Sequence, residues 1–71
     1  MQKEETKVVQ INGETKAVQG MSLLDYLVQE GYQPERIAVE CNGGIVSKAA
    51  YKEKLLEDGD VLEIVSFVGG G

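Results

Sequence analysis

The chain has 71 residues, of which 42% are hydrophobic and 27% charged, a balance typical of one small globular domain. Its 12 acidic and seven basic residues give a formal net charge of −5, which argues against a surface for nucleic acids or anionic membranes. The single cysteine excludes an internal disulfide and a cysteine-based zinc or iron–sulfur framework.

The acidic balance and the N-terminal residues bear on partners and location. Negative charge would speed encounter with a basic partner surface, or it serves only to keep the protein soluble. No apolar run approaches the length of a membrane span, and residues 1–5 lack the apolar core of a signal peptide. We therefore expect a soluble cytoplasmic protein that binds neither membranes nor nucleic acid.

A β-hairpin is predicted near the start of the chain. Residues 7–11 form a candidate strand, and Asn12-Gly13 is the strongest short signal for a hairpin turn. Residues 15–18 would return as the partner strand.

One amphipathic helix of about three turns is predicted next. Ser22 can cap it by accepting a hydrogen bond from the amide of Asp25, and Gly31 would end it in a left-handed conformation. The expected apolar stripe consists of Leu23, Leu24, Leu27 and Val28, with Tyr26 at its flank.

The second half of the chain contains three more predicted strands. Residues 37–41 form the first, residues 42–44 a tight turn, and residues 45–46 the start of a short partner strand. Residues 47–57 are expected to contain a short helical turn, and residues 61–67 form the final strand. The apolar points of the helical turn are Tyr51, Leu55 and Leu56.

Two hairpin-like regions around one helix predict an α+β fold. The compact solution is a β-grasp, ubiquitin-like roll, in which a mixed sheet of four to five strands packs on one main helix. We expect the β-grasp domain to span residues 6–68, after a disordered N-terminal extension (residues 1–5) and before a flexible glycine tail (residues 69–71).

Few side chains are candidates for catalysis. There is no histidine, and Cys41 lies on the inward face of a predicted strand, where packing is favoured over a nucleophilic role. Asp58 and Asp60 belong to a turn that aspartates stabilise through the backbone. Residues 42–44 lack the strand–loop–helix context and the lysine of a phosphate-binding loop. The side chains therefore argue against an enzyme.

The final strand places two groups of residues on opposite faces. Alternation puts Leu62 and Ile64 on one face and Glu63, Val65 and Phe67 on the other. Exposed apolar residues beside the tail would mark a contact surface for a partner. The pattern leaves a second interpretation open, in which Phe67 folds back over the edge of the sheet.

The sequence ends in three glycines, Gly69, Gly70 and Gly71, directly after Val68. Glycine forms a thin and flexible thread, and three residues reach about 10 Å when extended. Such a tail could carry its terminal carboxylate into a narrow active site of another protein. The competing interpretation is an incidental chain end without a function.

The chain resembles the ThiS family of sulfur carriers in thiamine thiazole biosynthesis. The resemblance rests on the segment Ile-Ala-Val-Glu-Cys-Asn-Gly-Gly-Ile-Val at residues 37–46, on Asp-Gly-Asp at 58–60 and on the ending at 63–71. It extends over most of residues 7–71. The chain departs from the family where Ser47 and Lys48 replace a common Pro-Arg, and where Cys41 replaces an aliphatic residue.

The resemblance implies a role as a protein co-substrate and not as an enzyme. A ThiF-like adenylating enzyme would use ATP and magnesium to form an acyl-adenylate on Gly71. Sulfur from a cysteine desulfurase system would convert it to a thiocarboxylate, and a ThiG-like thiazole synthase would receive the sulfur. Gly70 matches the penultimate glycine of the motif. Neither a bound cofactor nor a metal is implied for the carrier itself.

Two other functions share this tail chemistry. One is the small subunit of a molybdopterin synthase (MoaD-like), and the other is a ubiquitin-like modifier or interaction module. A β-grasp ferredoxin is excluded, because one cysteine cannot hold a cluster. The partner-contact residues expected from the sequence are Val65, Phe67 and Val68.

Overall fold

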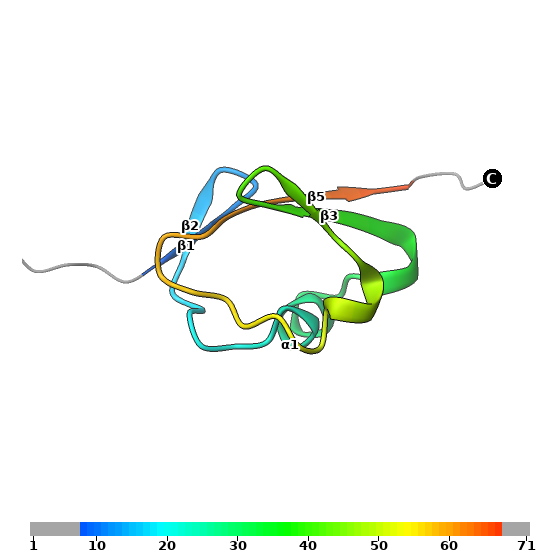
Figure 1. The fold of residues 1–71 in the computed structure, drawn as a ribbon, viewed down its shortest axis with the longest axis horizontal. Coiled ribbons are helices and arrows are strands. Elements are labelled where there is room, and N and C mark those ends of the chain that lie inside the picture. Colours follow the sequence, from blue (N-terminus) through cyan, green and yellow to red (C-terminus); the bar gives the residue numbers. More distant parts are fainter. Residues whose placement is uncertain (1–7, 68–71) are drawn as a thin grey trace, which may run out of the picture.

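The computed structural model describes residues 8–67, which form one mixed sheet with a helix packed on one face (Figure 1). The strands are β1 (Val9–Ile11), β2 (Glu14–Lys16), β3 (Ile37–Cys41), β4 (Gly44–Val46) and β5 (Val61–Ser66). The helices are α1 (Leu23–Gln29) and the 3-10 helices η1 (Pro34–Arg36) and η2 (Lys48–Ala50). No helix within this part of the chain is long and apolar enough to cross a membrane.

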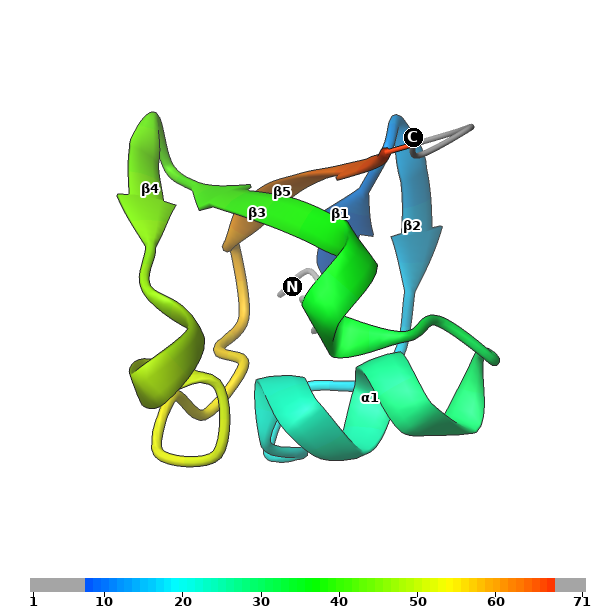
Figure 2. The ribbon, with the colours of Figure 1, turned by 90° about the vertical axis from the view of Figure 1, so that its right-hand side faces the viewer.

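The sheet has the strand order β2-β1-β5-β3-β4, with β5 at its centre. β5 pairs in parallel with β1 and antiparallel with β3, and the two hairpins β1–β2 and β3–β4 form the outer parts. α1 lies below this sheet in Figure 2, between the two hairpins in the sequence. The predicted β-grasp fold is therefore confirmed, with five strands in the sheet.

Both predicted Asn-Gly turns are present. Asn12 and Asn42 have φ angles of 52° and 54°, and the glycines that follow them, Gly13 and Gly43, have φ angles of 84° and 88°. Two successive left-handed residues are the signature of the type I′ turn, whose twist matches that of the flanking strands. Glycine is the residue that adopts this conformation without steric cost, which explains its place in both turns.

The predicted helix cap is confirmed, but the helix is shorter than expected. Ser22 Oγ accepts a 3.0 Å hydrogen bond from the backbone N–H of Asp25, and Gly31 has a φ of 85° just beyond the last turn. α1 contains seven residues, about two turns rather than three. The N-cap Ser22 and the C-cap Glu30 flank these seven residues and are not part of the helix.

The apolar face of α1 differs from the expected stripe. Leu23, Tyr26 and Leu27 are buried, whereas Val28 is 61% exposed. Positions i, i+3 and i+4 share one face of a helix, and Val28 lies a further 100° around it. The assignment of Val28 to the core was therefore wrong. Tyr26, which was predicted at the flank of the stripe, is buried instead.

Two other predicted segments also differ in detail. β2 begins at Glu14 and ends at Lys16, so it is shifted toward the turn relative to the prediction. In the connector after η2, Tyr51 and Leu56 are buried as expected, but Leu55 is exposed. Leu55 forms an isolated antiparallel bridge with Ser22, and its side chain is 54% exposed.

The core lies between the sheet and α1. It combines the inward residues of three strands, β1, β3 and β5, with residues of α1 and the connector. These residues are Val9, Ile11, Leu23, Tyr26, Leu27, Ile37, Val39, Tyr51, Leu56, Leu62 and Ile64. The two central strands β3 and β5 contribute alternate residues, as the period of two requires. Their remaining side chains consequently lie on the outer face of the sheet, away from α1.

Candidate functional site

The candidate site is the carboxyl end of β5 together with the face of the sheet around it. The predicted tail residues Val68, Gly69, Gly70 and Gly71 lie outside the described residues, as do residues 1–7. What the structure describes is the strand that leads to this tail.

The last two apolar residues before the tail are both exposed. Val65 is 57% and Phe67 54% exposed, whereas Leu62 and Ile64 on the opposite side of β5 are buried. The predicted alternation is therefore confirmed, and the exposure of Phe67 favours the outward interpretation over burial at the sheet edge. The N–H of Phe67 donates a 2.8 Å hydrogen bond to the carbonyl of Arg36, so the backbone at Phe67 is still attached to the domain.

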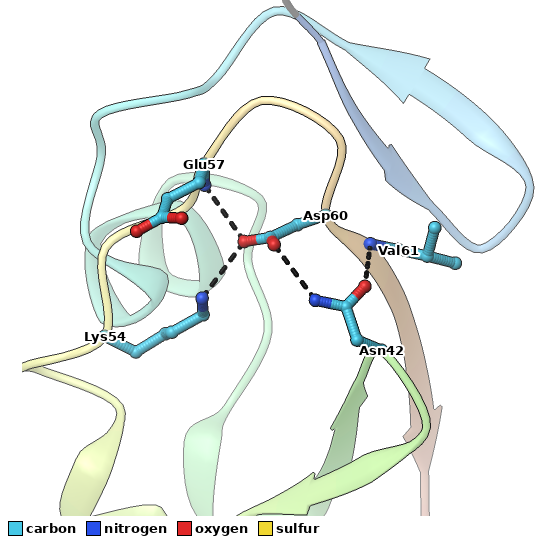
Figure 3. A network of polar contacts seen from close by, with 5 residues as sticks. All are labelled: Asn42, Lys54, Glu57, Asp60 and Val61. Atoms are coloured by element: carbon cyan, nitrogen blue, oxygen red, sulfur yellow. Dashed lines mark hydrogen bonds and ion pairs between the residues drawn. The ribbon is translucent and has the colours of Figure 1, made fainter.

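A network of polar contacts holds the start of β5 (Figure 3). Asp60 is buried, and its Oδ2 accepts hydrogen bonds from Lys54 Nζ at 3.0 Å and from the backbone N–H of Glu57 at 2.9 Å. Its Oδ1 accepts a 3.0 Å hydrogen bond from Asn42 Nδ2. Asn42 Oδ1 in turn accepts from the N–H of Val61 at 2.9 Å. The network thereby joins the β3–β4 turn, the connector and β5.

These contacts explain the direction of two pKa shifts. Burial alone raises the pKa of Asp60, but the hydrogen bonds from Glu57, Lys54 and Asn42 outweigh it and hold the pKa below its usual value. The hydrogen bond to Asp60 raises the pKa of Lys54, against the opposing effect of burial. The two groups therefore stay ionised and paired over the neutral range. The expected turn role of Asp60 is confirmed, but sequence reasoning missed its partners, which are distant in the chain.

Asparagine side chains bind β5 from both sides. Asn42 reaches Val61 from the β3–β4 turn, and Asn12 reaches the backbone of Ile64 from the β1–β2 turn. The sequence predicts turns at both positions but gives no signal that the amide side chains extend the sheet. Together with the bond at Phe67, these contacts hold β5 along its length.

The outer face of the sheet contains a hollow of about 460 Å³ beside the end of β5. We call it the outer-face hollow. Its lining residues are Ala38, Val39, Glu40, Ile45, Glu63 and Val65. Glu40 and Ile45 were not among the predicted site residues, although the alternation in residues 37–41 already placed Glu40 on the face opposite Val39.

Cys41 packs against the core and is partly buried. Burial is the main cause that raises the pKa of its thiol; the charge of Asp60 adds to this effect and Lys54 opposes it. A raised thiol pKa lowers the fraction of reactive thiolate at neutral pH. This environment agrees with the predicted packing role of Cys41. Among residues 8–67, no group of three or more Cys, Asp or Glu side chains is placed to hold a metal ion.

Comparison with known proteins covers nearly the whole chain. Residues 6–71 match the ThiS family. The sulfur carrier protein ThiS of Thermus thermophilus is 31% identical over 64 residues, which are 90% of this chain and 100% of that protein. The crystal structure of the thiamine biosynthesis protein ThiS from Geobacter metallireducens superposes with a TM-score of 0.73 at 28% identity, over 90% of this chain and 99% of that one.

A larger protein contains a similar segment. A thiazole synthase of Magnetococcus marinus is 39% identical over 64 residues, which are 89% of this chain. The chain spans only 20% of the length of that relative.

Proposed function

The chain belongs to the ThiS family, and from this premise we propose that it is a sulfur carrier protein that supplies sulfur for the thiazole moiety of thiamine. The observation that carries the proposal is the family match over residues 6–71, which includes the terminal glycines. It is supported by the attachment of the chain to the domain up to Phe67, whose N–H donates a hydrogen bond to the carbonyl of Arg36 immediately before the tail.

In the proposed cycle, the reacting group is the terminal carboxylate of Gly71. A carboxylate is a poor electrophile, so an adenylating partner uses ATP and magnesium to attach AMP to it, with release of pyrophosphate. A sulfur nucleophile, supplied through a cysteine desulfurase system, then attacks the carbonyl carbon and displaces AMP. The product is a thiocarboxylate, and thiazole synthase takes its sulfur. The carrier is thus a protein co-substrate and not the catalyst.

The partners in this proposal are a ThiF-like adenylating enzyme and a ThiG-like thiazole synthase. The second is supported by the segment similar to this chain within a protein named thiazole synthase. The exposed side chains of Val65 and Phe67, followed by Val68, are proposed to contact these partners and to guide the tail. Residues without side chains at 69–71 let the tail enter a narrow channel.

The function is tested by weighing the intact protein. The chain is incubated with a ThiF-like enzyme, ATP, magnesium and a sulfur source, and we expect a mass gain equal to the exchange of one oxygen for sulfur. Deletion of Gly71 removes the reacting carboxylate from its position, so the gain should disappear. A chain that keeps its original mass beside an active partner would contradict the proposal.

Transfer of the sulfur then tests the pathway. The loaded carrier is offered to a ThiG-like thiazole synthase and, in parallel, to the large subunit of a molybdopterin synthase. Loss of the sulfur to the thiazole synthase alone is the expected result. Transfer only to the molybdopterin enzyme would replace the thiazole assignment while leaving the carrier chemistry intact.

A further inference from the structure

The asparagines of the two Asn-Gly turns are exposed residues, yet both ends of each side-chain amide are hydrogen-bonded. Asn42 donates from Nδ2 to Asp60 Oδ1 at 3.0 Å and accepts at Oδ1 from the N–H of Val61 at 2.9 Å (Figure 3). Asn12 accepts from the N–H of Ile64 at 2.7 Å and donates to its carbonyl at 3.3 Å. The fold therefore holds both amides against β5.

The pair Asn-Gly is chemically labile, because glycine has no Cβ to hinder attack by its backbone nitrogen on the asparagine side chain. In this reaction the glycine nitrogen gives up its proton and bonds to Cγ, and the Cγ–Nδ2 bond breaks to release ammonia. Water then opens the resulting five-membered succinimide at either carbonyl. The products are aspartate and isoaspartate, and in isoaspartate the main chain runs through the side chain and is longer by a methylene.

The folded domain opposes this reaction at both turns. Ring closure requires rotation of the asparagine side chain and backbone, whereas each amide is bonded to its partners and each backbone is fixed in a type I′ turn between paired strands. The bonds from Asn12 and Asn42 end on or beside β5, the central strand of the sheet. Separation from a central strand requires a large part of the free energy of unfolding, so the reactive form is rare while the domain is folded.

From these contacts we propose that Asn12 and Asn42 are latent deamidation sites, unreactive in the folded domain and reactive when it unfolds, and that reaction at Asn42 is the more damaging. The two sites differ in what the lost Nδ2 contacted. At Asn42 the product places a second carboxylate against the buried carboxylate of Asp60. At Asn12 the lost donor faced only the neutral carbonyl of Ile64.

The consequence is that time spent unfolded is written into the covalent structure. A chain that has lost the amide of Asn42 refolds with repulsion at the start of β5, where Asn42, Lys54 and Asp60 join three segments. Its native state is then less stable than before, and further unfolding becomes more frequent. This inference does not depend on what the tail carries.

Reactivity is tested on the full chain at mildly alkaline pH, either folded in buffer or unfolded in guanidinium chloride. Peptide mapping by mass follows the replacement of NH2 by OH at each asparagine over time. We expect deamidation of Asn12 and Asn42 to be at least about tenfold slower in the folded protein. A synthetic peptide of residues 39–46 is the control, and guanidinium chloride should not change its rate. Equal rates in the folded and the unfolded chain would overturn the inference.

Variants that carry the product test the difference between the two sites. Asn42→Asp should unfold at a lower guanidinium chloride midpoint than Asn12→Asp, which is the matched control because it adds the same charge at the other turn. Asp60→Asn should lower the midpoint less in the Asn42→Asp background than in the wild type, since it also removes the repulsion between the two carboxylates. A less stable Asn12→Asp, or equal effects of Asp60→Asn in both backgrounds, would overturn the assignment of Asn42 as the more damaging site.

Discussion

The side-chain amide of Asn12 forms two hydrogen bonds with the backbone of Ile64. Asn12 Oδ1 accepts from the Ile64 N–H at 2.7 Å, and Nδ2 donates to the Ile64 carbonyl at 3.3 Å. The register pairs of β1 and β5 end at Ile11 and Leu62, and the last backbone hydrogen bond between the two segments runs from the N–H of Asn12 to the carbonyl of Leu62 at 2.9 Å. The amide thus takes the place of the next residue in the ladder, and it satisfies two polar groups that β1 is too short to reach.

Removal of this amide should weaken the attachment of β5. We expect Asn12→Gly to lower the free energy of unfolding by about 1–2 kcal/mol, because two partly buried hydrogen bonds are lost. Asn12→Ala should cost about 1 kcal/mol more, since alanine is strained at the positive φ that glycine tolerates. Urea unfolding of the wild type, Asn12→Gly and Asn12→Ala measures both losses of unfolding free energy. An Asn12→Gly variant as stable as the wild type would show that the amide contributes nothing.

The pair of Asp60 and Lys54 should make stability depend on pH at both extremes. The folded pKa of Asp60 is below its ordinary value of 3.8, so its contribution is present above that pH and is lost as the pH falls through the folded pKa. The folded pKa of Lys54 is above 10.5, so its contribution is present below that pH and is lost as the pH rises through the folded pKa.

Asp60→Asn isolates this contribution. We expect a loss of about 2 kcal/mol at pH 7, because a charged acceptor of three hydrogen bonds is removed and Lys54 loses its partner. The decrease of stability below about pH 4 should become shallower in this variant. Asp58→Asn is the control, since Asp58 is exposed and an amide oxygen can still accept from Val8. Stability is measured by thermal unfolding at several pH values between acidic and neutral. The same pH dependence of stability in Asp60→Asn and Asp58→Asn would contradict the prediction.

Replacement of the apolar residues beside the tail should reduce use by the adenylating enzyme. For Val65→Ser and Phe67→Ser we expect a rise in KM of about tenfold each, because exposed apolar anchors dominate binding at many interfaces. Val28→Ser is the matched control, an equally exposed valine on α1 that should leave KM unchanged. Steady-state release of pyrophosphate measures all three. A similar KM for Phe67→Ser and Val28→Ser would remove Phe67 from the contact surface.

Cys41 should be slow to react and dispensable for sulfur loading. Its partly buried thiol has a raised pKa, so we expect alkylation by iodoacetamide at pH 8 to be at least about tenfold slower than in the urea-unfolded chain. Cys41→Val keeps an apolar side chain of similar size and should still gain sulfur on Gly71. Loss of loading in a folded Cys41→Val protein would instead assign the thiol a role in the transfer.

Local signals in the sequence predicted much of the fold. The Asn-Gly turns and the Ser22 cap depend on residues within four positions of one another, and both have the expected geometry. Alternation along residues 61–67 correctly separated buried Leu62 from exposed Val65. These features follow from short-range chemistry, which a single sequence displays directly.

Features that depend on distant contacts were not predictable in the same way. The bond from Asn42 to Asp60 joins residues 18 positions apart, and that from Asn12 to Ile64 joins residues 52 apart. The choice between Tyr26 and Val28 for the core depended on how α1 is rotated against the sheet, which periodicity over two turns does not fix. The pairing of Glu40 with Glu63 likewise required the register of β3 and β5.

The central position of β5 has a mechanical consequence if the chain end enters the active sites of partners, as proposed above. Strand hydrogen bonds to β3 run across the strand direction, so a pull along β5 would load them in shear and all at once. An edge strand could instead be peeled away one bond at a time. Force applied to the tail would therefore be borne by the whole sheet, and the domain could be docked and released repeatedly without unravelling.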